Sequence, residues 1–76
     1  MTFIALSAAL VLTLTPEEQA ALNRTVAVET AALQNNADNA EALYRLGLAY
    51  LALGEPKKAV GPLEGLIGAV LGFLFG

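Results

Sequence analysis

The sequence predicts an all-α protein, because helix-start signals recur along the chain, apolar residues return at helical spacing and no alternating strand pattern competes. Helices are expected near residues 16–35, 40–53 and 56–67, with further helix or irregular chain at one or both apolar ends. The chain then divides into an apolar N-terminal segment (1–15), a helical domain (16–67) and a glycine-rich apolar C-terminal tail (68–76).

The N-terminal segment is uncharged, and residues 3–14 read FIALSAALVLTL. One interpretation is a secretory signal peptide with a small-residue cleavage site at Ser7-Ala8-Ala9, although no Lys or Arg precedes the apolar run. A second is a membrane anchor, although a helix of this length spans only about 18 Å of a hydrocarbon core of about 30 Å. A third is a helix that is buried or faces a partner. Membrane-associated and cytoplasmic locations therefore both stay open, with secretion less favoured.

The first predicted helix begins at a clear start signal. Thr15 suits the N-cap position, Pro16 suits the first helical position, and Thr15 with Glu18 makes a capping box. The asparagine-rich turn at residues 35–39 should end this helix. Its apolar face is formed by Leu22, Val26 and Leu33. Glu29 interrupts that face, so the helix is only weakly amphipathic.

The second predicted helix carries one apolar face, formed by Leu43, Leu46 and Tyr50 at positions i, i+3 and i+7. Gly47 on that face allows a neighbouring helix to approach closely, at a cost of about 1 kcal/mol in helix propensity. The helix start is capped either by Asp38, which has Glu41 three residues later, or by Asn39.

The turn into the third predicted helix also has recognisable residues. Gly54 suits the left-handed residue that ends a helix, and Pro56 suits the first turn of the next one. Ala59 and Leu63, four residues apart, give the third helix an inward stripe, and Pro62 is expected to kink it. These features predict a helical hairpin.

The same hairpin resembles one tetratricopeptide (TPR) repeat at about residues 38–67. That pattern is W-x2-L-G-x2-Y, eight residues, A-x3-F, and a later proline. The matching positions are Leu46, Gly47, Tyr50 and Ala59, with Leu43 in place of Trp and Leu63 in place of Phe. Leu71 stands where the proline is expected, and the helix at 16–35 looks like part of a degenerate preceding repeat. The resemblance implies a scaffold for protein contacts.

The resemblance also implies a binding groove lined by the second predicted helix. The corresponding residues are Glu41, Tyr44, Leu48 and Leu51. Some TPR proteins grip a C-terminal carboxylate there with Lys and Asn, but this chain has Tyr44 and Leu48 instead. An apolar groove for a helix or an extended peptide fits better. The alternative is that these side chains pack on the N-terminal segment.

Glycines recur through the C-terminal segment at positions 61, 65, 68, 72 and 76, on one face of a helix. We expect Gly68 and Gly72 to face a closely approaching helix, in lipid or on a partner, since small residues at this spacing let backbones touch. The other side of the segment is apolar and includes Phe73 and Phe75 as candidate contacts. The alternative is a glycine-rich, partly frayed apolar tail.

The composition excludes several function classes. The chain has no His and no Cys, which removes the usual nucleophile–base pairs and soft metal ligands, so neither an enzyme nor a bound cofactor or metal is expected. The net charge of −3 argues against nucleic acid as a partner.

The predicted function is binding to protein. Repeat proteins normally need about three stacked units for stability, and this chain has one clear repeat and one partial one. We therefore expect a small helical adaptor or accessory subunit that completes its core with a protein partner or as a homo-oligomer, in an assembly that could be membrane-bound. Membrane contact through residues 1–14 and 65–76 is an alternative, in a self-assembling or membrane-associating small protein. A truncated or engineered repeat fragment is another.

Overall fold

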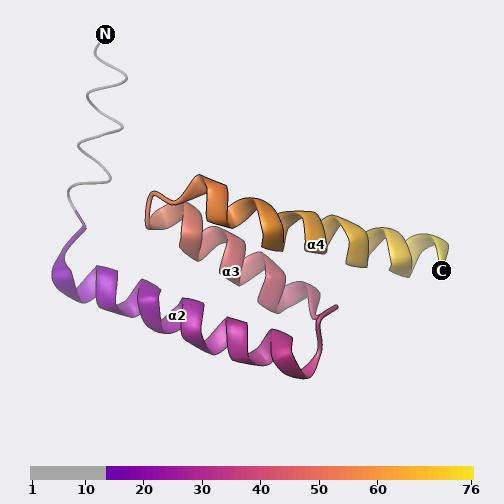
Figure 1. Cartoon of the computed structure of the whole chain (residues 1–76), viewed down its shortest axis with the longest axis horizontal. Helices are drawn as coiled ribbons and strands as arrows, with labels where there is room; N and C mark the ends of the chain where they lie inside the picture. The colour runs from indigo at the N-terminus through magenta and orange to yellow at the C-terminus, as the bar shows by residue number, and fades with distance from the viewer. Residues whose placement is uncertain (1–13) are drawn as a thin grey trace, which may run out of the picture.

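The computed structural model describes residues 14–76 and shows three helices there: α2 (Pro16–Asn35), α3 (Ala40–Ala52) and α4 (Pro56–Phe75) (Figure 1). The all-α prediction is confirmed, since this part of the chain contains no strand. The interpretations of the N-terminal segment concern residues 1–13 and thus lie outside the described residues.

Helix α3 is central to the arrangement, because it packs against α2 on one side and against α4 on the other (Figure 1). The molecule is flattened, with extents of 45 × 28 × 14 Å. Its buried apolar residues are Ala42, Leu43, Leu46, Ala49 and Ala59. All but Ala59 belong to α3, and three of the five are alanines, so the core of the described residues is small. A small core leaves little free energy to hold the fold as an isolated unit.

The start of α2 has the predicted capping box. The hydroxyl oxygen of Thr15 accepts a hydrogen bond from the Glu18 backbone N–H at 3.1 Å, and Glu18 Oε1 accepts from the Thr15 N–H at 3.1 Å. Of the two candidate caps for α3, the structure uses Asn39, whose Oδ1 accepts from the Ala42 N–H at 3.1 Å. Asp38 instead belongs to the preceding turn, because its backbone N–H donates to the side chain of Asn36.

The α3–α4 hairpin closes as predicted. Gly54 has a positive φ of 75°, in the left-handed region that favours glycine, and Pro56 is the first residue of α4. Close approach at Gly47 is also confirmed, since a Cβ on this residue would lie 2.7 Å from Leu63 Cδ2. At Gly65 a Cβ would lie 3.2 Å from Leu43 Cδ2. Two glycines, one on each helix, thus bring α3 and α4 together.

Helix α4 continues beyond the predicted end near residue 67 and reaches Phe75, with Pro62 inside it. The C-terminal segment is therefore helical as far as Phe75. The further helix expected at an apolar end is thus present here and is continuous with the helix predicted near residues 56–67, because each further residue adds a backbone hydrogen bond once a helix exists. Because α4 has 20 residues and α3 has 13, α4 is longer by about 10 Å at 1.5 Å per residue. Its last turns extend past the N-terminal end of α3 (Figure 1).

Candidate interaction surfaces

The first candidate surface is the solvent-facing side of α3, here called the α3 stripe and formed by Glu41, Tyr44, Leu48 and Leu51. All four predicted residues lie on one face of α3, opposite the buried Leu46, because their spacings of three and four residues match the helical turn. Tyr44, Leu48 and Leu51 are each about half exposed, so this face of α3 is apolar and uncovered by the described residues.

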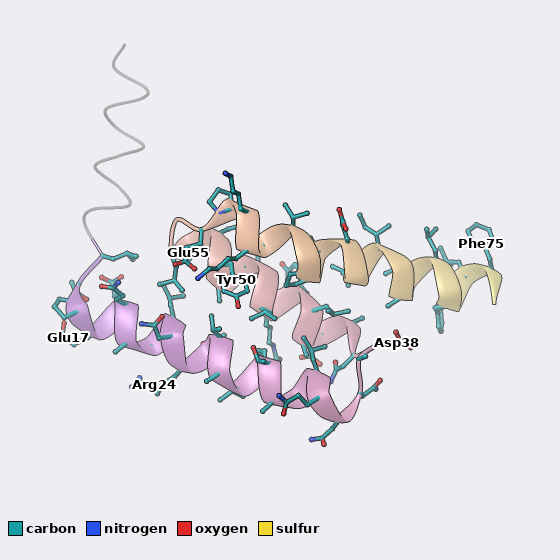
Figure 2. All side chains as sticks on the ribbon, viewed as in Figure 1. Glu17, Arg24, Asp38, Tyr50, Glu55 and Phe75 are labelled. Atoms are coloured by element: carbon teal, nitrogen blue, oxygen red, sulfur yellow. The ribbon has the colours of Figure 1, made fainter. Side chains whose placement is uncertain are left out.

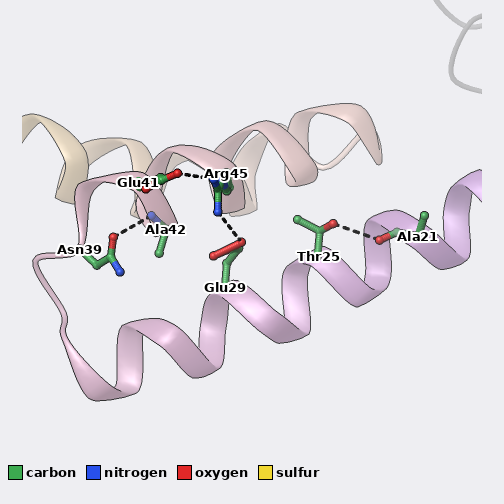
Figure 3. Close-up of polar contacts among 7 residues, drawn as sticks. All are labelled: Ala21, Thr25, Glu29, Asn39, Glu41, Ala42 and Arg45. Atoms are coloured by element: carbon green, nitrogen blue, oxygen red, sulfur yellow. Dashed lines mark hydrogen bonds and ion pairs between the residues drawn. The ribbon is translucent and has the colours of Figure 1, made fainter.

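A shallow groove of about 280 Å³ runs between α2 and α3 beside this stripe. It is lined by Leu22, Thr25, Arg45, Leu48, Ala49 and Ala52. The Thr25 hydroxyl already donates to the Ala21 carbonyl at 3.1 Å, so this polar group is satisfied within its own helix (Figure 3). Leu48 is the only residue of the α3 stripe that lines the groove. The α2/α3 groove is therefore suited to bind one apolar side chain rather than to catalyse a reaction.

Glu29 has a structural explanation that sequence reasoning missed. It is buried, and its Oε2 lies 3.9 Å from Nη1 of Arg45, which also pairs with Glu41 one turn earlier on α3 (Figure 3). The residue that interrupts the apolar face of α2 is thus the one that joins α2 to α3 by charge. The Arg45 side chain is 54% exposed, so water screens this pair. In the sequence this ion pair is indicated only by the opposite charges of Glu29 and Arg45, because helical spacing relates residues of one helix and not residues of two different helices.

The second candidate surface is the free end of α4, here called the α4 overhang and comprising residues 67–75. Its large exposed apolar residues are Ile67, Val70, Leu71, Phe73, Leu74 and Phe75. Phe73 is 88% exposed and Phe75 is 82% exposed. Figure 2 shows Phe75 at the far end of α4, away from the rest of the described chain. Such an apolar end favours contact with other apolar groups, because the part of the chain that the structure describes does not bury it.

A hollow of about 690 Å³, here called the α3/α4 hollow, lies where the overhang leaves α3. It is lined by Asp38, Ala40, Gly68, Ala69, Val70, Gly72, Phe73 and Leu74. A Cβ on Gly68 or Gly72 would meet no other part of the structure within 4 Å. No helix among residues 14–76 therefore approaches these two glycines, and the close approach of a helix there, in lipid or on a partner, stays a prediction.

The predicted site residues thus separate into two surfaces. Glu41, Tyr44, Leu48 and Leu51 belong to the α3 stripe, whereas Gly68, Gly72, Phe73 and Phe75 belong to the α4 overhang. Sequence reasoning missed the contribution of Asp38, Ala40 and Ala69 to the hollow. The inward spacing of α4, continued from Ala59 and Leu63, indicates that Ala69 faces the α3 side. Asp38 and Ala40 reach the hollow only because α3 begins there.

The described residues contain no cluster of His, Cys, Asp or Glu suited to hold a metal ion. Comparison with protein-family models, with curated proteins and with solved structures finds no match to this chain. The function must therefore be inferred from the two surfaces themselves.

Proposed function

We propose that the chain is a non-catalytic protein-interaction module, a small helical adaptor or accessory subunit that completes its core in a larger assembly. The α4 overhang carries this proposal, because two nearly fully exposed phenylalanines and four exposed aliphatic side chains lie within nine residues. Burying one such side chain is worth about 1.5–3 kcal/mol, so a partner that covers the overhang gains a large part of a typical binding free energy.

The α3 stripe supports the same proposal independently. The TPR-like spacing implies that this face of α3 lines a groove for a helix or extended peptide. The stripe is exposed and apolar, and Arg45 and Glu41 at its edge are paired with each other. The carboxylate clamp found in some TPR proteins is not proposed, because Tyr44 and Leu48 replace the polar residues it needs.

Membrane association is the second candidate, favoured by the character of α4. By length and composition α4 could cross a membrane, and it alone among the helices of residues 14–76. However, Glu64 lies near its middle, and Lys57 and Lys58 lie in its first turn. The uncharged part after Glu64 spans about 16 Å as a helix, roughly half of a hydrocarbon core of about 30 Å. This candidate therefore ranks below contact with protein.

Native mass spectrometry of the full chain, without detergent, tests the proposal. We expect specific assemblies, with a thermal unfolding midpoint that rises with protein concentration, because association stabilises the folded state by mass action. A double variant, Phe73→Ser with Phe75→Ser, should lose both effects while keeping its helical circular dichroism. The proposal would be contradicted by a wild-type chain that stays monomeric and cooperatively folded at every concentration and does not bind phosphatidylcholine vesicles.

A further inference from the structure

We draw no further inference here: the strongest candidate, the α3/α4 hollow at the root of the α4 overhang, is an open apolar surface, and nothing in the structure of residues 14–76 shows what covers it.

Discussion

A Cβ atom on Gly47 would lie 2.7 Å from Cδ2 and 2.9 Å from Cγ of Leu63, closer than two such carbons can approach. The two helices of the α3–α4 hairpin can therefore pack this closely only because Gly47 has no side chain. Gly61, on the other helix of the hairpin, has open space in the same position. The pair offers a comparison of the same substitution with and without a close neighbour.

Gly47→Ala is expected to destabilise the fold by about 1 kcal/mol net, because overpacking costs about 1–3 kcal/mol and the gain in helix propensity returns about 1 kcal/mol. Gly61→Ala should leave the stability nearly unchanged, because its Cβ meets no distant neighbour and the gain in helix propensity is offset by the clash of a Cβ with the following Pro62. Thermal unfolding at one protein concentration measures both. Only the midpoint of Gly47→Ala should fall, and a midpoint that does not fall would show that Leu63 moves aside without cost.

Arg45→Met is expected to cost more in the wild-type chain than in a Glu29→Leu background, because it leaves the buried Glu29 carboxylate without its cation. The coupling should be about 0.5–1 kcal/mol, reduced by the exposure of Arg45. Chemical denaturation of the four chains of this double-mutant cycle gives the coupling directly. Strictly additive effects would show that the pair does not join α2 to α3.

The pKa of Glu18 lies below its ordinary value, first because its carboxylate accepts from the Thr15 backbone N–H and second because of its contact with the Thr15 side chain. A folded-state pKa below the unfolded one adds stability that is present above the unfolded pKa and is lost as pH falls through the folded pKa. The first turn of α2 should therefore fray in acid. Thr15→Ala removes only the side-chain cause and keeps the backbone N–H, so carboxyl NMR titration should show a partial upward shift of the Glu18 pKa. An unchanged pKa would rule out the Thr15 side chain as a cause.

Phe73→Ser with Phe75→Ser should change the free energy of unfolding of the unassociated chain by less than about 0.5 kcal/mol, because both side chains lie almost wholly in water. Denaturation at high dilution, where association is lost, measures this term alone. Leu46→Ala is the contrasting control, with an expected cost of about 2–5 kcal/mol for a buried leucine. A large loss in the double serine variant would mean that the overhang folds back on its own chain.

The local signals in this sequence were sufficient to predict the order of the three described helices. Three local features were predicted, and the structure has all of them: the capping box of Thr15 and Glu18, the left-handed Gly54 and the close approach at Gly47. Each depends on residues within one or two helical turns or on a single glycine. Asn39 rather than Asp38 became the cap of α3 because the backbone N–H of Asp38 is held by Asn36 in the turn.

The candidate surfaces were predicted less completely, because they depend on where helices end relative to one another. The α3/α4 hollow exists because α4 extends past the N-terminal end of α3, whereas the sequence predicted a helix near residues 56–67 and left the tail after it as helix or irregular chain. Glu29 and Arg45 lie on different helices, so no spacing rule connects them. Tyr44 and Leu48 were by contrast grouped through the resemblance to a TPR repeat, and they do lie on one face of α3 because they are four residues apart.

The central claim is that the chain buries its α4 overhang against another molecule, and sedimentation equilibrium of the full chain without detergent tests it most directly. Over about a hundredfold range of concentration, the mass should rise reversibly above that of one chain, and the double variant Phe73→Ser with Phe75→Ser should remain at one chain throughout. A single-chain mass for the wild type across that whole range would contradict it, with a fluorescent probe attached beside Phe75 still accessible to a quencher in the solvent.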